Sequence, residues 1–521
     1  MHPAFRARPC VSAAAFAALA FLVLPSAPAA DRAPEPRAAA STLDEAIIAE
    51  ARSDRSEIMK NLQYLSDTIG GRLTGSKALE KANNWTADRM KDYGLENVRL
   101  EPWEIPMGWE RGRATMRLVE PGGGRDLLIA SAGWSPGTKG KVTGPVVIVN
   151  ARTKDELQKF KGKLKDAIVL TRPPTNVAPV TDLRYGPGGA PGKKDAKKDG
   201  AKTDEVPKKG ESKKDEQPVS FLQPPRGGVD ITEFAKAEGV ACICSDAGKP
   251  HGLLVTTGGW PTDRAAAEAR VPRVYMAHEH YAMLYRLAGD EKATVRAEVE
   301  IVNTFVPGPV TVYNTVGEVR GSEKPDEFVV VGAHLDSWEL ATGTTDNGTG
   351  SCVVLETARV VAALAKEGNR PKRTIRFVLF TGEEQGLHGS RQYVQKHKAE
   401  LDKHSAALVH DTGTGKVLGF GMQGRQSCMD VLAPQLESLK QVDGWTGLNI
   451  RNMGGTDHLP FNSAGVPGFA CLQDMDEYRL THHTQSDTFD KAKEPNLRQG
   501  VQVMAVTATR IANLPELLPR K

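Results

Sequence analysis

The chain has 521 residues, of which 40% are hydrophobic and 25% charged, with 51 Gly and 33 Pro. This composition excludes a collagen-like, fibrous or wholly disordered protein. The length predicts several domains, or one large domain with an insertion. A formal net charge of +4 gives no general electrostatic case for binding nucleic acid.

Residues 1–29 predict a signal peptide. Arg6 and Arg8 precede an apolar run from Val11 to Leu24, and Ala27-Pro28-Ala29 is typical of a cleavage site. The run is shorter than the roughly 20 residues that a membrane span needs. We therefore expect a secreted or periplasmic protein without stable membrane insertion, and a retained N-terminal anchor is the alternative.

Residues 30–107 are expected to form a linker and the N-terminal helical part of the main domain. The Ala/Pro-rich residues 31–42 are typical of the linker. Apolar residues at helical spacing then predict helices within residues 43–69 and 79–93. Between them, the turn Gly70–Ser76 separates the two helical patterns.

Residues 108–306 contain short apolar segments that predict a β-rich region, such as Val146–Val149, Ala167–Leu170 and Val240–Cys244. The cysteines of the whole chain show no regular spacing, which favours buried thiols over a disulfide framework. Residues 185–220 are rich in Lys and acidic residues and have almost nothing apolar. Such a stretch cannot bury enough surface to offset its ordering entropy, so we expect a disordered loop.

Residues 307–521 alternate strand and helix patterns. Buried-strand patterns occur at Phe328–Ala333, Thr374–Phe380, Ala406–Val409 and Val466–Cys471, and a helical pattern covers Gly350–Lys366. This order predicts the α/β class, with a mostly parallel mixed sheet flanked by helices. In such sheets, ligands bind beyond the carboxyl ends of the strands.

Metal-binding side chains occur at or soon after the ends of these predicted strands. Each has an ordinary explanation when taken alone, such as a turn or a helix cap. Together they offer two imidazoles and three carboxylates, a donor set that suits zinc, and adjacent buried acids need a cation to offset their repulsion. The candidate positions are His334 with Asp336, Asp346, the pair Glu383-Glu384, Asp411 and His483.

The order and spacing of four motifs resemble those of the co-catalytic zinc exopeptidases. This family includes secreted bacterial aminopeptidases and glutamate carboxypeptidases, and the branch that the chain most resembles is that of plasma glutamate carboxypeptidase (carboxypeptidase Q). The resemblance implies the zinc-exopeptidase fold, a protease-associated-like domain inserted over residues 108–306, and possible homodimers. The motifs are Val331–Ser337, Thr345–Gly350, Phe380–Ser390 and the loop at His483-Thr484.

Position by position, the resemblance implies a site for two Zn²⁺ ions. His334 and Asp411 would bind one ion, Glu384 and His483 would bind the other, and Asp346 would bridge the two.

Two further acids receive catalytic roles from the resemblance. Glu383 would be the general base, and Asp336 would orient His334. The family pattern also implies a cis peptide bond between Asp346 and Asn347.

The function implied is hydrolysis of dipeptides or short peptides by a bridging water activated by two zinc ions. A one-zinc glutaminyl cyclase or amidohydrolase on the same fold is one alternative, and a non-catalytic receptor-like relative is another. Preference for the amino or the carboxy terminus of the substrate stays open at this point.

Overall fold

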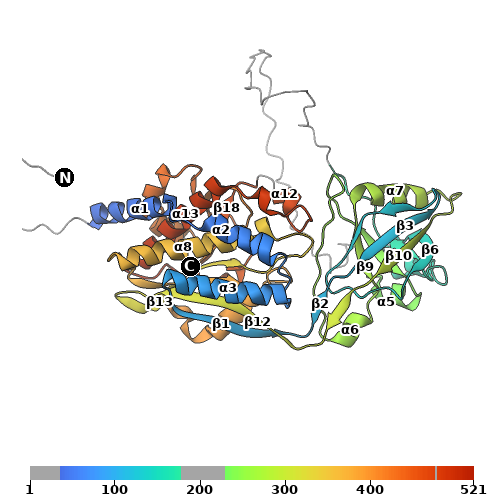
Figure 1. The fold of residues 1–521 in the computed structure, drawn as a ribbon, viewed down its shortest axis with the longest axis horizontal. Helices are drawn as coiled ribbons and strands as arrows, with labels where there is room; N and C mark the ends of the chain where they lie inside the picture. Colours follow the sequence, from blue (N-terminus) through green and yellow to red (C-terminus); the bar gives the residue numbers. More distant parts are fainter. Residues whose placement is uncertain (1–35, 178–228, 476–477) are drawn as a thin grey trace, which may run out of the picture. The chain divides into compact units, whose positions relative to one another are not determined.

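The computed structural model describes residues 36–177, 229–475 and 478–521 (Figure 1). The predicted signal peptide, residues 1–29, and the Lys-rich stretch, residues 185–220, lie outside the described residues. Residues 43–521 form one compact unit, and this unit contains every sheet described below.

Three helices precede the first strand: α1 (Pro36–Arg52), α2 (Ile58–Gln63), which continues into the π-helical turn η1 (Tyr64–Ile69), and α3 (Lys77–Tyr93). The two predicted helical patterns are confirmed. The linker expected over 31–42 is helical from Pro36 onward, because its alanines favour helix as well as linker. The Ser76 side chain accepts the Leu79 N–H and caps α3.

The main sheet has eight strands in the order β1-β12-β14-β13-β15-β18-β16-β17. Its centre is parallel, from β14 through β13 and β15 to β18, whereas β1, β12 and β16 pair with antiparallel neighbours. The strands are β1 (Glu96–Ile105), β12 (Val310–Val319), β13 (Lys324–His334), β14 (Arg373–Phe380), β15 (His404–Val409), β16 (Val417–Gly421), β17 (Gly447–Asn449) and β18 (Gly468–Gln473).

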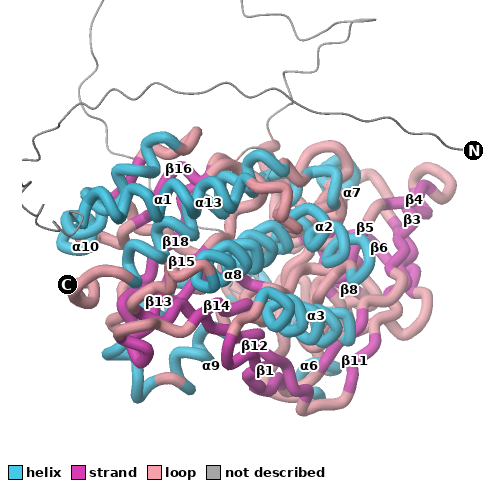
Figure 2. The backbone as a smooth tube through the Cα atoms, turned by 60° about the vertical axis from the view of Figure 1, so that its left-hand side comes forward, coloured by secondary structure: helices cyan, strands magenta, loops and turns pink. Residues whose placement is uncertain are grey.

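Helices cover both faces of this sheet. The helices α8 (Thr349–Lys366) and α13 (Glu494–Ala512) lie on the same face as α2 and α3 (Figures 1 and 2). Side chains of α9 (His388–Lys396) and α11 (His458–Ser463) join a separate core on the other face. The predicted α/β class, a mixed sheet flanked by helices, is confirmed.

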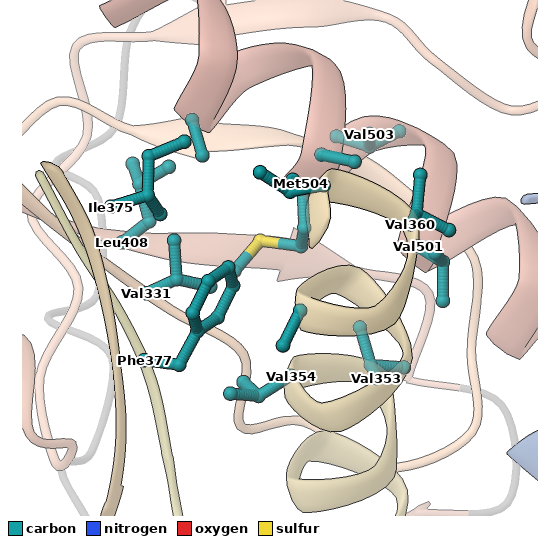
Figure 3. Packing of buried hydrophobic residues seen from close by; sticks show 14 of the residues in the cluster. Val331, Val353, Val354, Val360, Ile375, Phe377, Leu408, Val501, Val503 and Met504 are labelled. Atoms are coloured by element: carbon teal, nitrogen blue, oxygen red, sulfur yellow. The ribbon is translucent and has the colours of Figure 1, made fainter. Parts of the chain in front are cut away.

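Successive residues of β13 fill the two cores alternately. Val331 packs with Phe377 and Met504 on the α8 and α13 face (Figure 3), whereas Val330 packs with Tyr393 on the other. Full burial of one such side chain is worth about 1.5–3 kcal/mol. This two-sided burial explains why the strand patterns are continuously apolar.

Helix α8 with the turn before it is the one stretch among the described residues that is long and apolar enough to cross a membrane. In the window that meets this test, 94% of the residues are buried inside the protein. It is therefore the central core helix of the main sheet.

A second eight-stranded sheet, of order β4-β3-β10-β6-β7-β8-β9-β5, lies within residues 108–306. A short pair, β2 (Gly108–Glu110) and β11 (Thr304–Val306), flanks it in sequence. Its strands are β3 (Ala114–Glu120), β4 (Arg125–Leu127), β5 (Ile129–Ser131), β6 (Val142–Ile148), β7 (Ile168–Leu170), β8 (Cys242–Asp246), β9 (Arg273–Met276) and β10 (Arg296–Ile301).

Short helices complete the described chain. Those within residues 108–306 are α4 (Lys154–Gln158), α5 (Thr232–Ala237), α6 (Arg264–Glu268) and α7 (His278–Ala288). Those of the C-terminal part are η3 (Lys398–Lys403), α10 (Gln426–Leu432), η4 (Ala433–Gln441), α12 (Tyr478–Thr481) and η5 (Phe489–Lys491).

The cysteines behave as buried apolar residues. Cys242 and Cys244 of β8 face the same core, as their alternation predicts. Burial raises the pKa of the Cys242 thiol to about 12. Cys352, Cys428 and Cys471 are likewise free and buried.

Candidate metal centre

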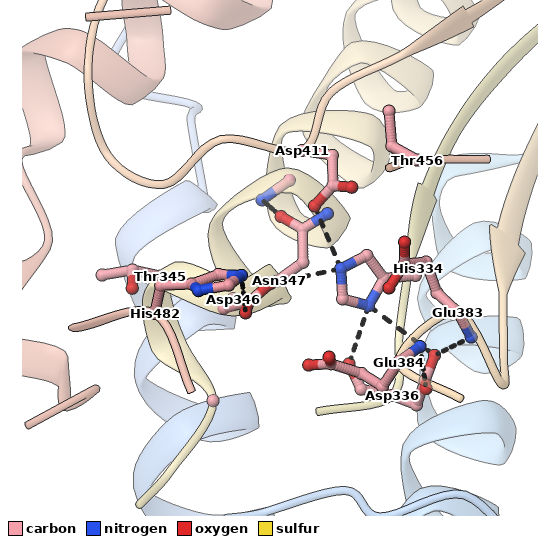
Figure 4. Close-up of polar contacts among 12 residues, drawn as sticks. His334, Asp336, Thr345, Asp346, Asn347, Glu383, Glu384, Asp411, Thr456 and His482 are labelled. Atoms are coloured by element: carbon pink, nitrogen blue, oxygen red, sulfur yellow. Dashed lines mark hydrogen bonds and ion pairs between the residues drawn. The ribbon is translucent and has the colours of Figure 1, made fainter. Parts of the chain in front are cut away.

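The carboxyl ends of the central parallel strands bring several of the predicted site residues together (Figure 4). His334 is the last residue of β13, and Asp411 follows β15. Glu383 and Glu384 follow β14. Because parallel strands end at the same edge of a sheet, these side chains gather there.

Two further elements reach this edge. Asp346 lies in the irregular turn η2 (Thr344–Gly348), directly before α8, and its peptide bond to Asn347 is cis, as the resemblance implies. His483 follows α12.

The first candidate ligand group contains His334, Asp411 and Asp346. The His334 Nε2 atom lies 3.0 Å from Asp411 Oδ1 and 3.3 Å from Asp346 Oδ1. One ligand atom from each of the three residues lies within 4.8 Å of the others. This is the distance range in which a single ion can be shared.

The second candidate group contains His483 and Glu384. The His483 Nε2 atom lies 2.9 Å from Glu384 Oε2 and 3.4 Å from Asp346 Oδ2. The neighbouring His482 Nε2 is farther from Asp346 Oδ2, at 3.8 Å, and its ring stacks on His483. Asp346 thus presents one carboxylate oxygen to each group.

Two oxygens of this cluster lack partners. Asp346 Oδ2 and Glu384 Oε1 are buried and have no hydrogen-bond donor, although buried oxygens are nearly always satisfied. Burial also raises the pKa of Glu384 well above its usual value, and the negative charge of Asp346 adds to this rise. A divalent cation would satisfy both oxygens and offset the repulsion, so the residues present fit a metal.

Neighbouring carboxylates shift the pKa of His334, the histidine of the first group. Burial alone would lower the pKa of His334, but the charges of Asp411 and Glu383 raise it well above its usual value. A metal ion would have to displace this proton, so binding there strengthens as the pH rises.

Asp336 is placed to hold both the histidine and the glutamate pair. Its Oδ1 lies 3.6 Å from His334 Nδ1, and its backbone carbonyl lies 3.0 Å from the same atom. Its two carboxylate oxygens accept the backbone N–H groups of Glu383 and Glu384. Thr74 donates a hydroxyl hydrogen bond of 3.0 Å to Asp336 Oδ2, so the turn Gly70–Ser76 touches the site.

Two positioning residues are absent from the sequence prediction. Asp487 accepts the N–H groups of Thr345 and Asp346, at 2.5 and 3.1 Å. Arg72 is fully buried and donates to the carbonyls of Leu335 and Gly343, at 2.7 and 2.6 Å. Their only sequence signal is position, Arg72 in the predicted turn and Asp487 in the polar loop after His483.

His482 also offers a ligand atom within 4.8 Å of those of Asp346 and His483, whereas His388, His410 and His458 join neither group. His458 is buried and contacts Gln423, and the backbone carbonyl of His410 accepts a hydrogen bond from Asn347. His388 packs against the rings of Trp103 and Trp260.

Residues 314–508 match the model of peptidase family M28. Carboxypeptidase Q of Mus musculus is 30% identical over 468 residues, which cover 88% of this chain and 87% of that protein. Carboxypeptidase Q of Bos taurus is 31% identical over 466 residues, with 88% and 86% covered.

Solved structures agree on the fold. A peptidase M28 precursor from Shewanella amazonensis superposes with a TM-score of 0.70 at 24% identity, covering 92% of this chain and 98% of that one. A zinc aminopeptidase from Bacillus subtilis gives 0.58 at 20% identity, covering 87% and 93%. The chain is a metallopeptidase that belongs to peptidase family M28, with carboxypeptidase Q among its relatives.

Proposed function

We propose that this protein is an exported exopeptidase that uses two zinc ions to hydrolyse dipeptides or short peptides. The observation that carries the proposal is the division of one carboxylate between two ligand groups. His334 and Asp411 lie at one oxygen of Asp346, and Glu384 and His483 lie at the other. A single-ion site would leave one of these groups without a charge to balance it.

The donor set supports zinc as the metal. Each group offers one imidazole and one carboxylate, with the shared Asp346 between them, and no thiolate takes part. The zinc aminopeptidase from Bacillus subtilis shares the fold. When bound, two zinc ions would supply a water of lowered pKa and polarise the scissile carbonyl.

Glu383 is the proposed proton carrier of the reaction. Its carboxylate forms no ion pair with the described residues, whereas that of Glu384 lies 2.9 Å from His483. Asp336 fixes the backbone of both. Burial raises the pKa of Glu383 well above its usual value, which favours a group that accepts a proton from water and returns it to the leaving amine.

Residues 108–306 are proposed as an insert that restricts the substrate to short peptides. Backbone contacts of Val255 and Thr256 with the loop of His483 support this role, since this part of the chain lies directly against a candidate metal ligand. Export rests on the predicted signal peptide, and N-terminal sequencing of the exported protein should find cleavage after Ala29. We also propose that the protein forms homodimers, and light scattering would measure its molar mass in solution.

The central experiment combines metal analysis with a dipeptide panel in which each terminus is blocked in turn. We expect two zinc ions per chain, loss of hydrolysis with a chelator, and recovery on adding zinc. The blocked substrates then report which terminus is read. One zinc per chain, with cyclisation of N-terminal glutamine, would instead identify a glutaminyl cyclase, and hydrolysis that survives complete zinc removal would refute the proposal.

A further inference from the structure

Residues 249–256, between β8 and α6, run alongside the loop that carries His483; we call this segment the strap. The N–H of Thr256 donates to the backbone carbonyl of His483, at 3.0 Å. Val255, which precedes Thr256, and Thr484, which follows His483, form an isolated antiparallel bridge. The strap therefore contacts the candidate ligand itself and the residue after it.

Side chains extend the contact on both sides of His483. Gln485 accepts the N–H of Leu254 at 2.7 Å and donates to the carbonyl of Gly252 at 3.2 Å. Before the histidine, Lys249 donates through Nζ to the carbonyl of Arg479 in α12. The strap thus contacts the chain both before and after His483.

The strap is itself anchored to the loop after β13. Thr256 is fully buried, and its hydroxyl accepts a hydrogen bond of 2.9 Å from Arg111. Arg111 also pairs with Glu339, at 2.8 Å. Glu339 follows Asp336 by three residues. The strap is therefore connected both to the loop that carries Asp336 and to the loop that carries His483.

The backbone of His483 needs such support. Its φ is 61°, in the left-handed region that residues other than glycine hold only when their surroundings fix them. The carbonyl that the strap binds belongs to this same residue. Trp338 adds an edge contact to its ring, with centroids 6.1 Å apart.

We propose that the strap positions His483, so that the insert is a working part of the second metal site as well as its cover. The positioning groups are the backbone N–H of Thr256 and the side-chain amide of Gln485. This inference rests on the proposed role of His483 as a zinc ligand. Substitution of the partners that orient a metal-binding histidine typically weakens metal affinity about 10–100-fold.

The test compares zinc affinity, measured by competition with a chromophoric chelator, between two variants and their controls. Thr256→Pro removes the N–H that His483 accepts, and its control, Thr256→Ser, keeps both that N–H and the hydroxyl that Arg111 binds. Gln485→Ala removes both amide contacts from an exposed side chain, and its control, Gln426→Ala, truncates an exposed glutamine of α10. We expect about 10-fold weaker binding of one of the two zinc ions in Gln485→Ala, and more in Thr256→Pro.

The visible absorption spectrum of the cobalt-loaded protein is a second measurement. It depends on the geometry of the metal ligands and does not require catalytic activity. Gln485→Ala should alter the spectrum, and Gln426→Ala should not. If Gln485→Ala binds zinc and absorbs like the unmodified chain while His483→Ala loses one ion, the strap has no positioning role and the inference is wrong. If His483→Ala retains both ions, the proposed function itself fails.

Discussion

The two adjacent glutamates at the end of β14 have different surroundings although they share a backbone turn. Glu384 Oε2 lies 2.9 Å from His483 Nε2, whereas the Glu383 carboxylate has no ion-pair partner among the described residues. A carboxylate that remains free can exchange a proton with water, and one that binds metal cannot. The proposed roles of the two differ accordingly, with Glu384 as a zinc ligand and Glu383 as the general base.

This division predicts opposite behaviour of two conservative variants. Glu383→Gln should keep both zinc ions and lose turnover by roughly 10²–10⁴-fold, the usual worth of a general base. Glu384→Gln should lose one zinc ion, because a neutral amide is a weaker ligand than a carboxylate. Metal analysis and kcat on a dipeptide check both, and metal loss in Glu383→Gln would mean that the roles are reversed.

The turn η2 owes its conformation to a residue far along the chain. Asp487 accepts two successive N–H groups, those of Thr345 and Asp346, and Thr345 also bonds Thr481 through its hydroxyl. These contacts join the loop before α8 to the loop after α12. Contacts from a distant loop thus fix the turn that carries Asp346, the proposed bridging ligand.

Asp487→Asn should weaken zinc binding about 10–100-fold, because an amide can accept only one of the two N–H groups and presents its own donor to the other. Zinc affinity, measured by competition with a chromophoric chelator, tests this prediction. Asp490→Asn, which changes an exposed acid three residues later, is the matched control and should bind zinc normally. Equal affinity in both variants would show that Asp487 does not position Asp346.

Strand β1 is tied to the segment after α9 through a buried charge. Glu101 is 2% exposed, and its carboxylate lies 3.0 Å from His397 Nε2. Burial raises the pKa of Glu101, but the hydrogen bond and charge of His397, with Arg99 and Lys396, outweigh it and lower the pKa to about 2. The ionised carboxylate therefore stabilises the fold above its usual pKa of 4.5, and this contribution is lost as the pH falls towards 2.

Glu101→Gln should accordingly cost about 1.5–3 kcal/mol of unfolding free energy at pH 7, the usual worth of hydrogen bonds to a charged group. Because the unmodified chain loses the same charge in acid, the difference should shrink near pH 2. Denaturant unfolding of the zinc-free protein at both pH values measures it. Glu104→Gln, an exposed position on the same strand, should be neutral, and a cost that persists undiminished at pH 2 would contradict the assignment.

At the scale of the whole molecule, local patterns predict the elements, and the resemblance supplies the candidate ligands, but neither predicts the contacts between distant segments. The apolar runs at Phe328–Ala333 and Thr374–Phe380 are buried on both faces, so their pattern is strong and β13 and β14 appear as predicted. Strand direction brings the site residues that end or follow β13, β14 and β15 to one edge of the sheet, whereas Asp346 and His483 reach that edge from η2 and from the loop after α12. Arg72 and Asp487 act through backbone groups, which leave no trace in side-chain spacing.

The Lys-rich stretch offers a final test of how the insert contributes. Contacts to the His483 loop come from residues 249–256, which lie well after residue 217. Deletion of residues 190–217 should therefore leave zinc content unchanged and dipeptide hydrolysis within about 2-fold of the intact chain, because so polar a segment has little apolar surface to bury. Steady-state kinetics and metal analysis of the shortened protein measure this. A collapse of activity with both zinc ions retained would assign the stretch a direct part in substrate binding, and loss of zinc would show that it supports the strap.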